Sequence, residues 1–263
     1  MHPCIPSAKH LCLVLSLLLL CLLAASPRAR ASEETILLGG PHEGWPPFFI
    51  PAPNGQPATG IMPDVLRAVA GRVDIKVKVV EAYYPDKRGM LYLTDGSLDA
   101  WPKSEKWVDD PHRYLWTDPV VVSTDVIVSR KRSPLPYHSP QDLVSRDIGV
   151  ILGYSYPTLE PLFKRGLITP FRAPATKHML RMLDRGHVDG AVCNRFVAQW
   201  ILREDEGLAP GDFLFSETPV DSAPYRFAFT RARDWTEFVE RFNNELKAMR
   251  EDGRLEAILN QYR

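Results

Sequence analysis

An eight-residue pattern occurs twice in the chain, as LTDGSLDA at residues 93–100 and as LDRGHVDG at residues 183–190. In each copy a predicted helix ends, a glycine stands where a helix takes a left-handed C-terminal cap, and an Asp follows three residues later to open a strand. The copies lie ninety residues apart, each after a helix-like segment and before a short strand-like run. We infer two similar α/β lobes rather than one sheet, with chance similarity as the alternative.

The segments around these copies alternate between β-branched and helical patterns. Predicted strands cover residues 34–38, 75–80, 120–128, 147–151, 190–193 and 226–230. Predicted helices cover residues 61–70, 90–93, 179–183 and 196–202, and a charged helix pair over 234–262 is broken at 252–253. Strands that alternate with helices indicate an α/β fold with a parallel-type sheet and covering helices.

The composition excludes several classes of protein. The 263 residues include 32 basic and 32 acidic side chains and are 45% hydrophobic. A chain of this length buries a proper core, and its hydrophobic content argues against disorder. The balanced charge argues against a protein that binds nucleic acid by neutralising phosphates. The 7 His show no metal-ligand spacing, so we expect neither a metal nor a cofactor.

Residues 1–31 read as a cleavable secretory signal peptide, which predicts a periplasmic protein. The apolar run at 11–25 is shorter than the roughly twenty residues that span a bilayer, and small residues precede a cleavage point after Ala31. A membrane anchor and a lipoprotein attached at Cys21 are the weaker alternatives. After cleavage Cys193 is the one remaining cysteine, so no internal disulfide forms, and we expect it to be a buried small hydrophobe.

Several motifs in order along the chain resemble the family-3 periplasmic solute-binding proteins, the receptors of polar amino-acid ABC transporters. They are WPPF at 45–48, NG at 54–55, GIMPD at 60–64, GSLD at 96–99, WTDP at 116–119, IGVILG at 148–153, GHVD at 186–189 and the tail at 246–262. The resemblance implies the type II periplasmic binding protein fold, with two Rossmann-like lobes joined by two hinge strands near 123–128 and 222–227. It also implies a ligand held in the cleft between the lobes, which close by hinge bending.

The resemblance implies a division of the chain into segments and a function. Residues 1–31 are the signal peptide, 32–125 the first segment of lobe 1, 126–222 lobe 2, and 223–263 the segment that returns to lobe 1. We expect a monomer that captures a small polar solute, an amino acid or a related compound, and delivers it to an ABC transporter permease. Nucleic acid is not an expected partner.

Candidate ligand contacts in the first lobe are mostly aromatic. Trp45 and Phe48 follow the first predicted strand, where their rings can sandwich a carbon skeleton or face a cation, although both could instead fill the core. Trp101 is a further candidate contact. Lys103 and Ser104 lie in the loop after the next strand and could hold an anion, with a solvated surface lysine as the alternative for Lys103.

The chain departs from its amino-acid-binding relatives at two charged positions. The Arg that grips the ligand carboxylate in those relatives falls here at or beside Asp110, with Arg113 about a turn away, and the Asp that holds the ammonium corresponds to Asn194. An amide accepts a hydrogen bond but does not neutralise charge, so these changes argue against a standard α-amino acid. The loop that matches the family's helix N-terminus adds three predicted contacts, Tyr154, Ser155 and Tyr156.

Two other functions remain as alternatives. One is a periplasmic sensor that acts in trans on a membrane signalling protein. The other is an enzyme on the same fold, similar to cyclohexadienyl dehydratases, with Glu43, Glu105 or Glu160 as candidate acids. The stretch around Ser155 is a weak match to a nucleophile elbow because Pro157 replaces the second glycine. We therefore expect no enzymatic activity.

Overall fold

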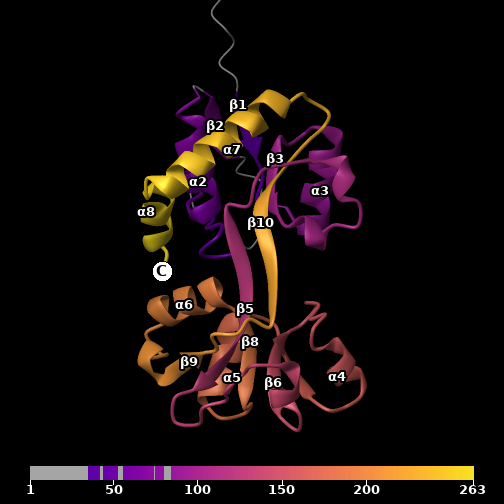
Figure 1. The fold of residues 1–263 in the computed structure, drawn as a ribbon, viewed down its shortest axis with the longest axis vertical. Helices are drawn as coiled ribbons and strands as arrows, with labels where there is room; N and C mark the ends of the chain where they lie inside the picture. The colour runs from indigo at the N-terminus through magenta and orange to yellow at the C-terminus, as the bar shows by residue number, and fades with distance from the viewer. Residues whose placement is uncertain (1–34, 42–43, 53–55, 74, 80–83) are drawn as a thin grey trace, which may run out of the picture. The chain divides into compact units, whose positions relative to one another are not determined.

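The computed structural model describes residues 35–41, 44–52, 56–73, 75–79 and 84–263 (Figure 1). The predicted signal peptide and Glu43 lie outside the described residues. In the part of the chain that is described, no helix is both long and apolar enough to span a bilayer.

The strands occur in this chain order: β1 (Thr35–Leu38), β2 (Lys76–Val79), β3 (Ala100–Lys103), β4 (Leu115–Trp116), β5 (Val121–Arg130), β6 (Asp147–Ile151), β7 (Thr169–Ala173), β8 (Gly190–Asn194), β9 (Phe213–Phe215) and β10 (Asp221–Phe229). The α-helices are α2 (Ile61–Ala70), α3 (Asp86–Asp95), α4 (Glu160–Lys164), α5 (Thr176–Asp184), α6 (Arg195–Glu204), α7 (Thr236–Glu251) and α8 (Arg254–Asn260). The short 3-10 helices are η1 (Glu105–Trp107), η2 (Pro111–Arg113), η3 (Pro140–Leu143) and η4 (Pro210–Asp212).

The sheet consists of two parallel groups joined through two long strands. Its order is β2-β1-β3-β10-β5-β8-β6-β7, with β4 beside β10 and β9 beside β5. Strand β1 pairs in parallel with β2 and β3, and β6 pairs in parallel with β7 and β8. The long strands β5 and β10 run antiparallel to each other between the two groups (Figure 1). This confirms an α/β fold with two lobes joined by two crossing strands. Strands β4 and β9 add antiparallel pairs with β10 and β5.

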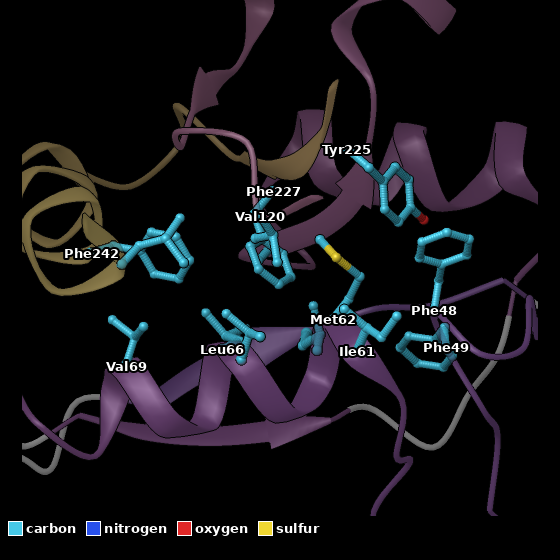
Figure 2. Packing of buried hydrophobic residues seen from close by; sticks show 14 of the residues in the cluster. Phe48, Phe49, Ile61, Met62, Leu66, Val69, Val120, Tyr225, Phe227 and Phe242 are labelled. Atoms are coloured by element: carbon cyan, nitrogen blue, oxygen red, sulfur yellow. The ribbon is translucent and has the colours of Figure 1, made fainter. Parts of the chain in front are cut away.

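The C-terminal helices pack against α2, the first helix of the described chain. In Figure 2, Leu66 and Val69 of α2 point toward Phe227 of β10 and Phe242 of α7, and all four side chains are fully buried. Helices α7 and α8 both contact α2. The apolar faces of segments far apart in sequence therefore share one core. The predicted lobe boundaries at 125/126 and 222/223 fall within β5 and β10 and stay predictions.

The repeated eight-residue pattern has the same structure in both copies. Gly96 and Gly186 follow α3 and α5 with φ of 82° and 80°, a left-handed conformation that side chains with a Cβ resist. The Asp99 carboxylate accepts a hydrogen bond from Leu37 N at 2.7 Å, and the Asp189 carboxylate accepts one from Asp147 N at 3.0 Å. Each Asp thus ties its new strand to the neighbouring parallel strand, and the repeat is structural rather than a chance similarity.

Most predicted elements are confirmed with errors at their ends, whereas β4, β7, β9 and α4 were not predicted. The strands predicted at 147–151 and the helix predicted at 61–70 match β6 and α2. Helix α3 begins four residues before the predicted 90–93, because polar residues at its start conceal the helical period. Strand β10 begins at Asp221 rather than 226, and its first half, DSAPY, contains a proline that disfavours a strand prediction.

Candidate functional site

The loops with the candidate residues follow strands that end beside the crossing pair. Lys103, the last residue of β3, lies opposite Arg226 of β10, and Asn194, the last residue of β8, lies opposite Asp125 of β5. Because Tyr225 pairs with Val121, the end of β3 and the end of β8 reach β5 at positions about five residues apart, or about 17 Å of strand. The carboxyl ends of the parallel strands in both lobes therefore approach the same stretch of β5 and β10, where ligands bind in open α/β sheets.

An aromatic cluster lies at the first-lobe end of this stretch, formed by Trp45, Phe48, Trp107 and Tyr225. The Trp45 ring centroid lies 4.4 Å from Phe48, 5.1 Å from Tyr225 and 5.9 Å from Trp107. Phe48 also contacts Phe196 of α6 at 5.5 Å, so the cluster extends to the helix that follows Asn194. Figure 2 shows the rings of Phe48 and Tyr225 near each other.

Members of the cluster differ in exposure. Phe48 is fully buried, Trp45 is partly buried, and Trp107 is 44% exposed. The hydroxyl of Tyr225 donates to Pro102 O at 3.2 Å, which fixes its ring beside the end of β3. Trp45 and Trp107 therefore have ring surface that a solute could cover, whereas Phe48 packs the core beneath them.

The predicted contact Trp101 is 1% exposed and lies in a separate small core. Its ring lies against Gly39 and Gly89, where an added Cβ would come within 2.8 Å of the indole. The two glycines thus make room for the indole, and Trp101 has a packing role in this structure.

Basic side chains gather where β3 ends. Arg226 is opposite Lys103 and contacts Glu105 at 3.5 Å, and its Nε is buried without a hydrogen-bond partner. Lys106 Nζ donates to Ser222 O at 3.0 Å. Ser104 is fully buried, and its hydroxyl accepts a hydrogen bond from Lys106 N at 3.3 Å, so it caps the turn η1. The Lys103–Ser104 loop is thus a basic turn with an internally bonded serine.

The position expected to hold a carboxylate-binding Arg has a surface ion pair instead. Arg113 Nε donates to Asp110 Oδ2 at 3.0 Å, and both side chains are more than half exposed. The pair spans one short turn and faces solvent. It therefore does not replace the missing Arg.

Asn194 links the second lobe to the crossing strands. Its Oδ1 accepts from Val197 N at 3.3 Å and caps α6, while its Nδ2 donates to Ser123 Oγ at 2.8 Å. Asn194 lies directly opposite Asp125 of β5. Burial, and then the charge of Asp221, raise the pKa of Asp125 to about 6. The negative charge missing at Asn194 is therefore present next to it, on β5.

The loop after β6 contains one buried and two exposed candidates. Tyr156 is almost fully buried, its hydroxyl accepts from Ile151 N at 2.8 Å, and burial raises the pKa of that hydroxyl. Tyr154 is 59% exposed, and Ser155 is exposed as well. Tyr156 consequently holds the loop, while Tyr154 and Ser155 are accessible to a solute. Helix α4 begins at Glu160, later than the predicted helix N-terminus at this loop.

The sequence did not single out four residues that the structure brings to this region, Trp107, Tyr225, Asp125 and Asp221. Asp125 and Tyr225 lie on the crossing strands. For Asp125 the sequence did hold a signal, because an acidic side chain stands there within an apolar run. Glu105 and Glu160, the described candidate acids, form ion pairs with Arg226 and Lys164. Cys193 is buried and unpaired, and burial raises the pKa of its thiol. Among the described residues, no group of three or more His, Cys, Asp or Glu is placed to hold a metal.

The profile of the bacterial extracellular solute-binding proteins, family 3, matches residues 38–263. The chain belongs to this family. Members of the family are extracellular solute-binding proteins, which agrees with the resemblance read from the motifs. A comparison of this solute-binding protein with curated proteins finds no match.

Solved structures share the fold of this family 3 solute-binding protein at low identity. An ancestral cationic amino acid solute-binding protein has a TM-score of 0.69 at 21% identity, covering 87% of this chain and 95% of that one. Substrate-binding domain 2 of Lactococcus lactis GlnP, in an open conformation, has a TM-score of 0.68 at 20% identity, with coverage of 87% and 94%. A histidine kinase sensor domain has a TM-score of 0.63 at 23% identity, with coverage of 88% and 96%.

Proposed function

We propose that the protein is a periplasmic solute-binding protein that captures one small polar solute and passes it to the permease of an ABC transporter. The observation that carries the proposal is that loops of both lobes, at the ends of β3 and β8, reach the same stretch of β5 and β10. In that arrangement one solute can contact both lobes, and its binding energy favours their closing around it.

The accessible groups suggest how the solute is held. Trp45 and Trp107 offer ring faces to an apolar or cationic part, and Tyr154 and Ser155 offer hydroxyl groups from the other lobe. Lys103 supplies positive charge, whereas Asn194 and Asp125 supply an amide and a carboxylate. We propose a solute that carries both an apolar body and polar ends, an amino acid derivative or a related compound.

A thermal-shift screen of small polar solutes, followed by calorimetry, tests this proposal. A 1:1 complex with a rise in melting temperature supports it. The same solutes, incubated with the protein and recovered, are expected unchanged. Steady formation of a product would instead favour the dehydratase-like enzyme, and no binding by any solute class would contradict the proposal.

A sensor that acts in trans is the second candidate, supported by the likeness in fold to a histidine kinase sensor domain. A transport receptor stimulates ATP hydrolysis by its reconstituted permease when loaded with solute. A sensor leaves that activity unchanged and alters the signalling protein. The genes encoded beside this chain identify which membrane partner to test.

A further inference from the structure

Two carboxylates face each other across the crossing strands. Asp125 of β5 lies directly opposite Asp221 of β10 in the antiparallel register. Side chains in such positions project from the same face, with Cβ atoms about 5 Å apart, and like charges there repel. When both groups are ionised, the pair opposes the strand pairing that joins the lobes.

The surroundings leave one carboxylate oxygen of this pair without a donor. Thr158 Oγ1 donates to Asp221 Oδ1 at 2.6 Å, but Asp221 Oδ2 is buried and has no hydrogen-bond partner. An unsatisfied buried oxygen costs free energy, and a proton on Asp125 would supply the missing donor. Two carboxyl groups that share a proton avoid both the repulsion and the unsatisfied acceptor.

The groups that act on Asp125 do not supply a counter-charge, and the amine of Lys106 is bonded at 3.0 Å to the carbonyl of Ser222, the neighbour of Asp221. Those acting on Asp125 are Asp221, Asn194, Tyr156 and Cys193, and none of them is a cation. Burial raises the pKa of the Tyr156 and Cys193 side chains, so both stay neutral. Tyr137, which faces Asp221, has a pKa raised by burial as well. Protonation of Asp125 therefore relieves the repulsion between the two carboxylates.

We propose that Asp125 holds a proton in mildly acidic solution, and that this proton, beside Asp221 on the facing strand, strengthens the pairing of β5 with β10, so that the stiffness of the hinge depends on pH. Loss of the proton leaves two like charges on facing strands and loosens the connection between the lobes. The inference concerns the protein without solute, so it stands or falls separately from the proposed function.

The direction of the pH effect follows from proton linkage. The pKa of Asp125 is raised in the folded chain from 3.8 to about 6, so the folded protein holds more protons than the unfolded chain between these values. Stability therefore falls as the pH rises from about 4 to about 6 and levels off above it. Between pH 4.5 and 7.5 the folding equilibrium constant is expected to fall by roughly 20-fold from this group alone.

The test is a titration of the aspartate carboxyl carbons by NMR in the solute-free protein. We expect one carboxyl group with a midpoint near 6 that is absent in Asp125→Asn and moves to lower pH in Asp221→Asn. In parallel, the protection of the β5 amides from hydrogen exchange should fall by roughly tenfold in the wild type between pH 5 and 7.5, after correction for intrinsic rates. Asp125→Asn should remove this dependence, while Asp212→Asn, an exposed aspartate in η4, should retain it.

A wild-type Asp125 midpoint near 4 would overturn the proposal. An Asp125 midpoint that is unchanged in Asp221→Asn would also overturn it. The same holds for amide protection with equal pH dependence in the wild type and Asp125→Asn. The wild-type titration is decisive by itself if a variant does not fold.

Discussion

Trp45 is the single side chain that we expect to carry most of the solute contact in the first lobe. Its ring is partly exposed and packs against the rings of Phe48 and Tyr225. Trp45→Ala removes a preorganised ring face and should weaken solute binding more than tenfold, or about 1.4 kcal/mol, while the fold persists. Calorimetry with the solute found by screening measures the loss.

The matched control for Trp45→Ala is Phe171→Ala, which removes an exposed ring from β7. That variant should bind the solute as the wild type does. Unchanged affinity in Trp45→Ala would remove the ring from the site.

Tyr262 attaches the end of the chain to the start of α2. Its hydroxyl accepts from Gly60 N at 2.9 Å and donates to the Asp64 carboxylate, and burial together with Asp64 raises its pKa to about 12. Tyr262→Phe leaves a helix N-terminal N–H without its acceptor and should cost about 1–2 kcal/mol of unfolding free energy. Urea unfolding measures this cost, with Tyr92→Phe in α3 as the control. Equal stability of Tyr262→Phe and the wild type would show that water replaces the hydroxyl.

At the scale of elements, the turn after α3 depends on the lack of a side chain at Gly96. Gly96 and Gly253 both have φ of 82°, but a Cβ at Gly96 would lie 2.7 Å from the Ala232 Cβ, whereas one at Gly253 would meet nothing within 4 Å. Gly253→Ala should therefore cost only the backbone strain, about 1 kcal/mol, and Gly96→Ala about 1–3 kcal/mol more. Equal losses in thermal or urea unfolding would refute the packing argument.

The sequence predicted elements best where local signals agree. Helix α2 has apolar residues at helical spacing on its core face, and its bounds match the prediction. The repeated pattern identified Asp99 and Asp189 as strand-opening residues, and the structure adds the backbone amides that they accept from. Strand β7, TPFRA, was missed because it is short and mostly exposed, so tertiary pairing with β6 rather than its own pattern makes it a strand.

At the scale of the whole molecule, candidate site residues were harder to predict than the fold. Their roles depend on which side of a strand or loop faces the neighbouring element. Phe48, Trp101 and Tyr156 have the aromatic character of ligand contacts, but packing buries each of them. Trp107 and Tyr225 join Trp45 only because η1 and β10 meet in the folded chain. The sequence around each residue does not predict this contact between η1 and β10.

The charges of the whole site predict its selectivity. Asp110 and Arg113 form a surface pair, and Lys103 offers a point charge rather than a planar fork for a carboxylate. Simple polar α-amino acids should therefore bind weakly, with dissociation constants above micromolar. Calorimetry with glutamine, arginine and histidine checks this. A submicromolar constant for any of them would overturn the inference from the missing Arg.

The central claim is that both lobes hold one small solute and release it unaltered. The most direct test incubates the wild type and Trp45→Ala with a pool of small polar metabolites. Native mass spectrometry then measures how much solute each protein has bound. Denaturation afterwards releases that solute, so that its mass can be determined. We predict one solute per wild-type protein, recovered at its original mass, and little or none on Trp45→Ala. No complex with any solute, equal loading of both proteins, or recovery of a chemically altered molecule would contradict it.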